Sequence, residues 1–294
     1  MLVAVTVCST SLPGQDFVWT KTSAPYWNWN SVASSSDGTK LVAVVTGGGG
    51  IYTSTNSGLT WTLTSAPTSG WESVVSSSDG TKLAAVAAYD GIYISTNSGA
   101  TWTQTSTPNT GWLSVASSSD GTKLVAGGWG GIYTSTNSGA TWTQTGAPSE
   151  EWFSIASSSD GTKLAAISAV YLSGSIYTST NSGLTWTQTS APSVNWQSIA
   201  SSSDGTKLVA VVSGGGIYTG NPSPSLTLQF LSGYPLLSLY GTLGDTYTVQ
   251  YTTNLAAPNW TPMLIVPNLS ISPFQMIDPA GVGQPMRFYR AMQQ

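Results

Sequence analysis

The sequence predicts an all-β protein in which a five-bladed β-propeller precedes a small antiparallel β-sandwich. The first observation is a repeat: "SSSDGTKL" or a close variant recurs with its Asp at residues 37, 79, 120, 160 and 204, at intervals of 40 to 44 residues. The second is the octapeptide "STNSGLTW" or "STNSGATW", which recurs four times with the same rhythm. The third is that no segment has a sustained helical period. Repeats of this length with several short strands are typical of propeller blades.

Each repeat is predicted to contain four short strands. In the second repeat they cover residues 71–77, 82–88, 91–96 and 101–106. The Asp-Gly pair of "SDGTK" predicts a tight hairpin between the first two strands, and the octapeptide lies between the last two. The predicted blades cover residues 26–66, 67–107, 108–147, 148–191 and 192–221.

The N-terminal residues are predicted to complete the last blade. The fifth repeat stops at "GIYTGNPSPS" (216–225) and lacks a fourth strand, whereas "FVWTKTSAP" (17–25) matches "LTWTQTSAP" (184–192). We therefore expect residues 16–25 to pair as the missing fourth strand and to close the ring, which would remove an open sheet edge. Residues 1–15 are assigned no element, with an extra strand on the closing blade as one alternative.

The repeat gives way to different sequence after residue 221, so the predicted domains are 1–221 and 222–294. A short Pro/Ser linker, "NPSPS", joins them. Six strand-like segments with intervening turn signals follow and predict a sandwich resembling fibronectin type III or immunoglobulin-like modules. These segments are residues 226–231, 236–241, 246–252, 260–266, 273–278 and 286–291.

The composition excludes several functional classes. Charged residues make up 7% of the 294 residues, the net charge is −4, and the two arginines, Arg287 and Arg290, lie near the C-terminus. Nucleic acid is therefore not an expected partner, because phosphate binding needs clustered Lys and Arg. The chain has no His and a single cysteine, Cys8, so we expect no intrachain disulfide, no transition-metal site and no cofactor. The one metal alternative is a hard cation held by carboxylates and carbonyls, and no metal ligand is assigned. No apolar run is long enough for a membrane span.

The N-terminus and the overall composition favour an exported protein. Residues 2–7, "LVAVTV", are too short for a signal peptide and follow no basic segment. We interpret them as a mature or truncated start and expect a secreted or cell-surface location, with a cytoplasmic start as the alternative. The abundance of hydroxyl and amide side chains is common on secreted β-proteins.

The octapeptide resembles the Asp-box, or bacterial neuraminidase (BNR) repeat, whose pattern is Ser/Thr-x-Asp-x-Gly-x-Thr-Trp/Phe. In that family the box forms the turn between the third and fourth strands of a propeller blade. The family includes sialidases, xyloglucan-active enzymes, photosystem assembly factors and non-catalytic receptors. Here an Asn replaces the Asp, and its carbonyl oxygen can accept the same backbone hydrogen bonds. The replaced positions are Asn56, Asn97, Asn137 and Asn181.

The resemblance to the Asp-box family does not extend to sialidase activity. The family's sialidases bind the substrate carboxylate with three arginines, yet residues 1–221 contain no Arg. Because Lys cannot reproduce a bidentate clamp on a carboxylate, sialidase activity is excluded.

The C-terminal segment is similar to a module that ends many secreted multidomain proteins of Verrucomicrobia and related bacteria. That similarity implies export and a surface or spacer role.

The variable loops are the predicted ligand site. The hairpins "SSSDGTK" and the octapeptide turns barely vary and should share one face of the propeller. The opposite face receives the loops between second and third strands and between successive blades, which diverge strongly. Aromatic rings with nearby carboxylates and amides are suited to binding sugars. The alternative is that these loops are surface loops whose sequences vary without forming a ligand site. The candidate ligand-binding residues are Tyr26, Trp27, Tyr89, Asp90, Trp129, Glu150, Glu151 and Tyr171.

Three functions compete on this face. The leading hypothesis is a secreted, non-catalytic binding module for a glycan or cell-surface polymer. The alternative is a carbohydrate-active hydrolase, which needs two carboxylates about 5–5.5 Å or about 6.5–9.5 Å apart. The third is a structural or assembly protein that docks another protein chain on a flat apolar face. The carboxylates available for catalysis are Glu72, Asp90, Glu150 and Glu151.

Overall fold

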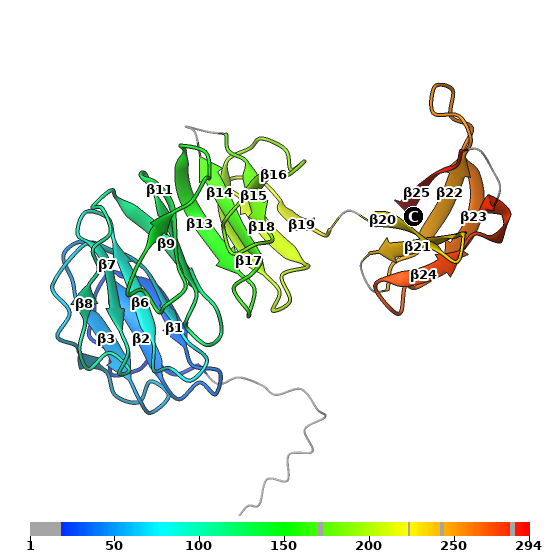
Figure 1. Ribbon diagram of the computed structural model, residues 1–294. Coiled ribbons are helices and arrows are strands. Elements are labelled where there is room, and N and C mark those ends of the chain that lie inside the picture. The colour runs from blue at the N-terminus through cyan, green and yellow to red at the C-terminus, as the bar shows by residue number, and fades with distance from the viewer. Residues whose placement is uncertain (1–18, 170–172, 223, 242–243, 283–285) are drawn as a thin grey trace, which may run out of the picture.

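The computed structural model describes residues 19–169, 173–222, 224–241, 244–282 and 286–294. Over these residues the chain is almost entirely β-structure, with strands β1 to β25 and one short 3-10 helix (Figure 1). None of the helical structure described is long and apolar enough to cross a membrane. The predicted all-β class is therefore confirmed.

Five consecutive antiparallel sheets follow the repeats, each with its strands in chain order. Sheet 1 contains β1 (Trp29–Ser34), β2 (Leu41–Val45), β3 (Ile51–Ser54) and β4 (Thr62–Leu63). Sheet 2 contains β5 (Trp71–Ser76), β6 (Leu83–Ala87), β7 (Gly91–Ser95) and β8 (Thr103–Gln104). Sheet 3 contains β9 (Trp112–Ser117), β10 (Leu124–Gly128), β11 (Gly131–Ser135) and β12 (Thr143–Gln144). Sheet 4 contains β13 (Glu151–Ser157), β14 (Leu164–Ala169), β15 (Ile176–Ser179) and β16 (Thr187–Gln188). Sheet 5 contains β17 (Trp196–Ser201), β18 (Leu208–Val212) and β19 (Ile217–Gly220).

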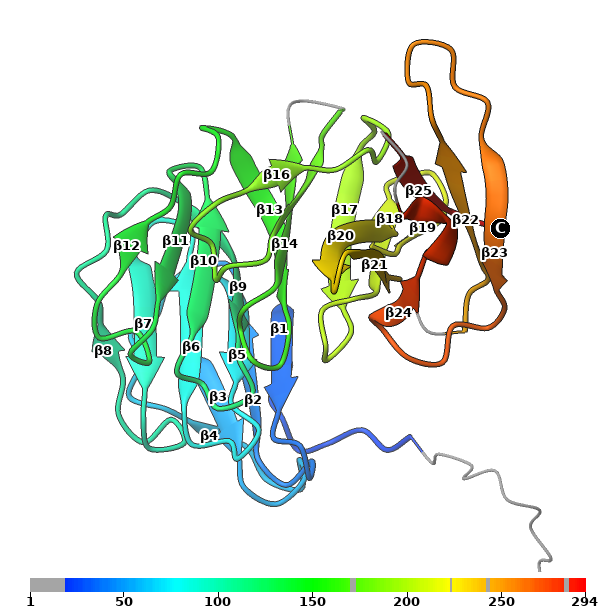
Figure 2. The same cartoon turned by 45° about the vertical axis from the view of Figure 1, so that its right-hand side comes forward.

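The sheets stack face to face around an arc, with their first strands toward its inside (Figures 1 and 2). The first strand of each sheet packs on the first strand of the next. A serine in that strand also accepts a hydrogen bond from a backbone amide of the next sheet. The contact occurs four times: Ser31 Oγ with Val74 N at 3.2 Å, Ser73 Oγ with Val115 N at 3.4 Å, Ser114 Oγ with Ile155 N at 3.0 Å and Ser154 Oγ with Ile199 N at 3.2 Å. It satisfies amides that the inner edge of each sheet would otherwise leave unpaired.

Apolar cores fill the spaces between successive sheets. The tryptophan that begins a first strand is their largest member: Trp71, Trp112 and Trp152 are 0% exposed. In its own sheet each of them meets a tyrosine of the third strand edge to face, as Trp71 meets Tyr93 with ring centroids 5.2 Å apart. The tryptophans that end the octapeptides are only partly buried, at the margin of this core.

The octapeptide folds into a turn held by its Ser and Asn side chains. In the first copy, Asn56 Oδ1 accepts from Thr60 N at 2.9 Å and Ser54 Oγ accepts from Gly58 N at 2.9 Å. Asn56 Nδ2 also donates to Thr60 Oγ1 at 2.9 Å, a bond that Asp could not donate. The backbone adopts positive φ at Gly58 and also at Ser57. Asn therefore fills the Asp position without losing a hydrogen bond.

The "SDGTK" hairpins are held by their Asp carboxylates. Asp37 Oδ1 accepts from Ser35 Oγ at 2.6 Å and from Thr39 N at 3.0 Å. These bonds, that from Ser35 first, lower the pKa of Asp37 to about 2. Asp79, Asp120, Asp160 and Asp204 have the same partners and likewise have lowered pKa values. The hairpin acids thus stabilise the turns, and the tight hairpins that the Asp-Gly pairs predict are present.

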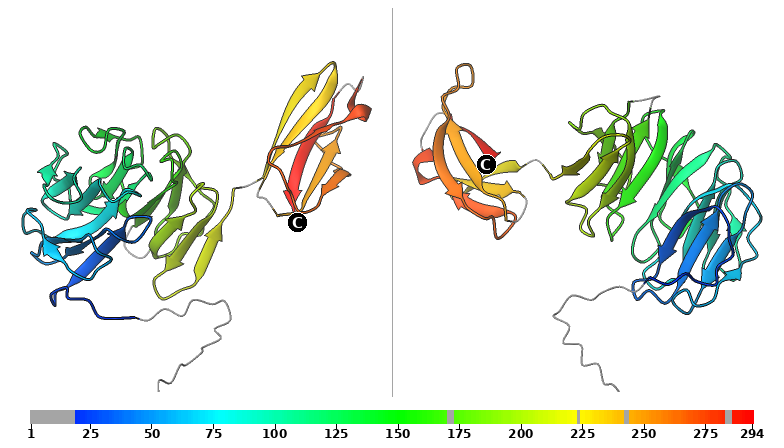
Figure 3. Two further views of the ribbon diagram at one scale, coloured as in Figure 1. Left: turned by 90° about the horizontal axis from the view of Figure 1, so that it is seen from below. Right: turned by 180° about the vertical axis from the view of Figure 1, so that it is seen from behind.

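The predicted closure of the ring is wrong for the part of the closing segment that the structure describes. Sheet 5 has three strands, and residues 19–25 do not pair with β19. They lie against sheet 1, where Ser23 Oγ donates to Leu59 O at 2.8 Å. The arc between sheets 5 and 1 stays open (Figure 3), and Ile217 of β19 is 74% exposed whereas Ile51, its counterpart in sheet 1, is 0% exposed. The sequence match therefore does not identify the part of the repeats that residues 19–25 contact.

The C-terminal residues form two further sheets, in the order β20-β21-β24 and β23-β22-β25. They share one core, to which Leu237 and Leu239 contribute from one sheet and Tyr247 and Val249 from the other. All six predicted segments are strands. Their bounds are β20 (Ser225–Leu231), β21 (Tyr234–Tyr240), β22 (Tyr247–Thr252), β23 (Thr261–Val266), β24 (Phe274–Ile277) and β25 (Phe288–Gln293), with the 3-10 helix η1 at Pro279–Gly281.

Candidate functional site

Because the strands of each sheet follow one another in chain order, their connections lie alternately at the two ends of the strands. Hairpins such as 35–40 and octapeptide turns such as 54–61 lie at one end of the strands, which we call the turn face. There Ser57 N donates to Thr39 O at 2.9 Å, and three other sheets repeat this bond. Loops such as 46–50 and 64–70 lie at the other end, which we call the loop face. The repeated hydrogen bonds make the turn face a scaffold and leave the loop face as the place where the repeats differ.

Two exposed aromatic rings meet on the loop face. Tyr89, between β6 and β7, is 67% exposed, and Trp129, between β10 and β11, is 50% exposed. Their ring centroids are 5.6 Å apart at an interplanar angle of 68°. Large rings that stay exposed while packed edge to face form a pre-arranged apolar platform beside polar loops.

The loop between sheets 2 and 3 holds this pair in place. Asn109 Nδ2 donates to the backbone carbonyl of Tyr89, and Trp129 N donates to Gly111 O at 3.1 Å. Gly111 has a φ of 76°, and a Cβ there would lie 2.8 Å from Cε3 of Trp129. A glycine is therefore required beneath the indole, both for its backbone conformation and for the close approach.

Asp90 follows Tyr89 and adds a carboxylate to the platform. Its side chain accepts a hydrogen bond from the buried Ser69 hydroxyl, and its backbone carbonyl accepts one from Gln104 Nε2. After burial, the charge of Asp90 is the second cause that raises the pKa of the Tyr93 hydroxyl. The carboxylate is thus exposed but fixed in direction, as a ligand-orienting group needs to be.

Glu72 lies at the loop-face end of β5. Asn30 of β1 bridges to it, with Nδ2 donating to Glu72 Oε2 at 3.0 Å and to Glu72 O at 2.9 Å. This contact joins the first strands of sheets 1 and 2. Asn30 was missed by the sequence reasoning, which gave no signal that its amide would meet the Glu72 carboxylate.

Glu150 and Glu151 lie at the start of sheet 4. Glu150 Oε1 accepts from the Tyr177 hydroxyl at 3.1 Å. Burial first, and then this hydrogen bond, raise the pKa of Tyr177, so that it remains a donor. Glu151 is exposed as the first residue of β13. The partner of Glu150 therefore lies in sheet 4, whereas Asp90 contacts Ser69, between sheets 1 and 2, and Gln104 of sheet 2.

The remaining predicted residues lie elsewhere on the chain. Tyr26 and Trp27 precede β1 and are 94% and 55% exposed, and Lys21 Nζ lies 5.7 Å from the centroid of the Tyr26 ring. Tyr171 lies outside the described residues. The structure thus brings together Tyr89, Asp90 and Trp129.

Three of the described acids have separate hydrogen-bond partners. Glu72, Asp90 and Glu150 accept from Asn30, Ser69 and Tyr177, respectively, and no hydrogen bond joins two of the candidate carboxylates within the described ranges. The same residues contain no group of three or more His, Cys, Asp or Glu side chains arranged to hold a metal ion. What the loop face offers is a rigid aromatic pair with amide, hydroxyl and carboxylate groups around it.

Comparison with known proteins identifies the fold of the repeated sheets. No family model matches the sequence, and no curated protein matches it significantly. A GH74 enzyme of Niastella koreensis aligns with a TM-score of 0.52 and 19% identity over 72% of this chain and 42% of its own. YCF48 bound to a D1 peptide aligns with a TM-score of 0.50 and 16% identity over 74% and 76% of the two chains.

An ancestral GH74 enzyme aligns with a TM-score of 0.49 and 16% identity over 81% of this chain and 32% of its own. The chain therefore spans less than half the length of either GH74 structure. At these identities the similarity concerns the fold. Together with the stacked four-stranded sheets, the Niastella enzyme and YCF48 show that the repeated part of the chain has a β-propeller fold.

Proposed function

We propose that the chain is a non-catalytic binding protein that recognises a glycan or a glycan-like cell-surface polymer on the loop face. The exposed Tyr89–Trp129 pair is the observation that carries this proposal. A sugar presents C–H groups on the faces of its ring and hydroxyls at its rim. An aromatic platform bordered by Asp90 and Asn109 complements both kinds of group.

The architecture that we propose around this site follows the repeat. Sheets 1–5 are blades of an Asp-box-like propeller in its Asn variant, with boundaries near residues 66, 107, 147 and 191. Residues 222–294 are a fibronectin- or immunoglobulin-like sandwich that acts as spacer or attachment. A secreted or cell-surface location fits a chain with 7% charged residues.

Two other functions remain alternatives to this proposal. Hydrolysis has the fold of the GH74 neighbours in its favour, but it requires a pair of carboxylates acting on one bond, and Glu72, Asp90 and Glu150 are each held by a different partner. Docking of a protein chain has the YCF48 complex with its D1 peptide in its favour. The protruding edge-to-face pair favours a sugar over a flat protein interface.

A glycan array read with the labelled full chain tests the proposal. We expect selective binding to a subset of glycans, and at least about a tenfold loss of affinity in Tyr89→Ala/Trp129→Ala. The control is Leu59→Ala/Leu184→Ala, which removes two exposed apolar side chains from the turn face and should leave binding unchanged. Absence of binding by the unaltered chain, or an equal loss in the control, would contradict the proposal.

A further inference from the structure

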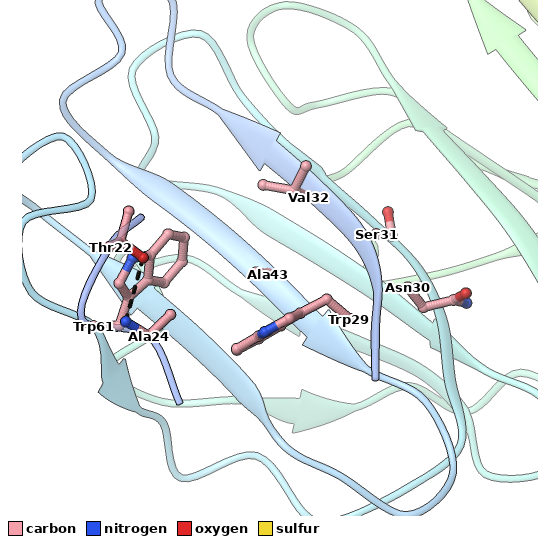
Figure 4. A pocket seen from close by; sticks show the side chains of 8 residues that line it. All are labelled: Thr22, Ala24, Trp29, Asn30, Ser31, Val32, Ala43 and Trp61. Carbon is pink, nitrogen blue, oxygen red and sulfur yellow. Dashed lines mark hydrogen bonds between the residues drawn. The ribbon is translucent and has the colours of Figure 1, made fainter. Parts of the chain in front are cut away.

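The outward face of sheet 1 lacks the cover that every later sheet has. Trp29 and Val32 are 37% and 68% exposed, whereas their counterparts in sheet 2, Trp71 and Val74, are 0% and 3% exposed. In sheet 2 the cover consists of apolar side chains from the second and third strands of sheet 1. In front of sheet 1 there is instead an open cavity of about 340 Å³, lined by Trp29, Val32 and Ala43 on one side and by Thr22, Ala24 and Trp61 at its margin (Figure 4).

Residues 19–25 already occupy the place of the fourth strand of a preceding sheet. Ser23 Oγ donates to Leu59 O at 2.8 Å, as Ser65 Oγ of sheet 1 donates to Ala100 O of sheet 2 at 3.3 Å. The methyl group of Thr22 sits beside Gly58 just as that of Thr64, in the fourth-strand segment of sheet 1, sits beside Gly99. Residues 19–25 thus make the contacts of a fourth-strand segment, while the described residues leave the space beside them in front of sheet 1 unfilled.

One contact around Gly58 identifies what is missing. At the equivalent glycines of sheets 2, 3 and 4, the atom nearest to the position of a Cβ is a methyl carbon from the third strand of the preceding sheet. These methyl carbons are Thr53 Cγ2 at 2.7 Å from Gly99, Ile94 Cγ2 at 2.5 Å from Gly139 and Thr134 Cγ2 at 2.8 Å from Gly183. At Gly58 the described residues provide no such third-strand atom within 4 Å, and the nearest atom among them is Leu41 Cδ1 at 3.3 Å.

The order of strands along the chain identifies the segment that would supply the missing third strand beside Gly58. In every repeat that has a fourth strand, the third strand lies immediately upstream and ends in "S-T-N", as at 54–56. Upstream of residues 19–25 the sequence reads "LVAVTVCSTS" (2–11), an apolar, β-prone run that ends in "S-T-S". Aligning Ser9 with Ser54 places Cys8 at the position of Thr53. Residues 2–11 lie outside the described residues.

We propose that residues 2–11 of this same chain bind on the open face of sheet 1 as the third strand of a further sheet, with Cys8 beside Gly58 and Leu41. The apolar residues of the segment cover Trp29 and Val32, and residues 19–25 form the adjacent fourth strand. The N-terminal segment therefore belongs to a sheet that precedes sheet 1.

Cys8 is the only cysteine of the chain, so a single substitution gives an unambiguous distance test. In Leu41→Cys, mild oxidation should form an intramolecular disulfide between Cys8 and the introduced thiol, because such a bond requires Cα atoms within about 7 Å. Peptide mapping before and after reduction identifies it. The matched control is Leu184→Cys, on the turn of sheet 4 and 77% exposed, which should form no disulfide with Cys8.

The unaltered chain provides the second measurement, which does not depend on the variant. Cys8 should react with a thiol reagent at least about tenfold more slowly in the native protein than in denaturant, because packing beside Leu41 buries it. A native rate equal to the unfolded rate, or absence of the intramolecular disulfide in Leu41→Cys, overturns the proposal. Disulfide-linked dimers of Leu41→Cys also overturn it, since they would show that a second copy covers the face.

Discussion

The repeated sheets and the C-terminal module secure their polar groups in opposite ways. In the repeats, one modest contact is copied from sheet to sheet: Lys40 Nζ donates to Asp79 O at 3.0 Å, and Lys82 and Lys163 do the same one and three sheets further on. In the module, one charged cluster occurs once. Arg287 lies 2.5 Å from Asp278, which also accepts from the Tyr289 hydroxyl at 2.8 Å.

The difference teaches where each region is vulnerable. A copied contact distributes stability, so that loss of one copy leaves several equivalents intact. The module concentrates its polar interactions on Asp278, which is 3% exposed, with Arg287 stacked over the Tyr251 ring at 4.1 Å. Burial, and then the hydrogen bond to Asp278, raise the pKa of Tyr289 to about 12. Removing one member of such a cluster leaves a charge without its partner.

The largest effect is expected from Asp278→Ala. It removes the acceptor of both Arg287 and Tyr289 and should lower the free energy of unfolding of the module by about 2–4 kcal/mol. Hydrogen exchange should accelerate in β22 and β25 and stay unchanged in sheets 1–4. If exchange in the repeats rose equally, the two regions would form one cooperative unit and the comparison would fail.

The next-largest effect is expected from lowering the pH, which should destabilise the repeated sheets through their hairpin carboxylates. The hairpin carboxylates have folded pKa values below their ordinary value of 3.8, to about 2 for Asp37 and Asp120. A lowered pKa contributes stability that is present above pH 3.8 and is lost as the pH falls toward 2. Thermal unfolding of the repeats should therefore shift to lower temperature between pH 4 and pH 2. In Asp120→Asn the shift should be smaller, and an identical shift in that variant would contradict a role for the carboxylate.

A single copy of the inter-sheet contact should matter less. Ser114→Ala removes the acceptor of the Ile155 amide, which is 3.0 Å away, and should cost about 1 kcal/mol. Chemical denaturation of the full chain measures it. Ser198→Ala is the control: this serine occupies the equivalent position in sheet 5, which has no following sheet. An equal cost at Ser198 would show that the hydroxyl does not act between sheets.

The smallest effect is expected from restoring the family's box residue. Asn97→Asp keeps the oxygen that accepts from Thr101 N at 2.9 Å and replaces one donor, which the Thr101 hydroxyl can compensate by donating in return. The free energy of unfolding at pH 7 should change by less than about 0.5 kcal/mol. A loss of several times that value would show that the Asn amide is required, and that the box is not tolerant of either residue.

The sequence predicted most of the fold because the determinants of the fold are local. The repeat period and the turn signals located the strands, and the Asp-Gly pairs form hairpins as expected. The place where residues 19–25 lie was not predictable in this way, because each of sheets 1 to 4 has the same octapeptide turn and only the contacts of Thr22 and Ser23 identify sheet 1. Likewise, a short motif cannot say that the first-strand Trp is buried more deeply than the octapeptide Trp.

The sequence predicted which loop residues belong to the candidate site, but not the contacts that bring them together. Divergent loops pointed to Tyr89, Asp90 and Trp129, yet their meeting depends on the positive φ of Gly111 and on the Asn109 bond to the Tyr89 carbonyl. Asn109 lies in "STPNTG", a loop with no aromatic or acidic residue to mark it. The separate surroundings of Glu72 and Glu150 likewise depend on Asn30 and Tyr177, which are distant in sequence.

Hydrogen exchange of the full chain, with and without the tightest-binding array glycan, tests the central claim that the divergent loop face is functional and the repeated turn face is scaffold. The account predicts slower exchange at residues 87–91, 106–111 and 127–131, with no change in the hairpins near Asp79 and Asp120. Protection confined to the turn face or to residues 222–294 would contradict it.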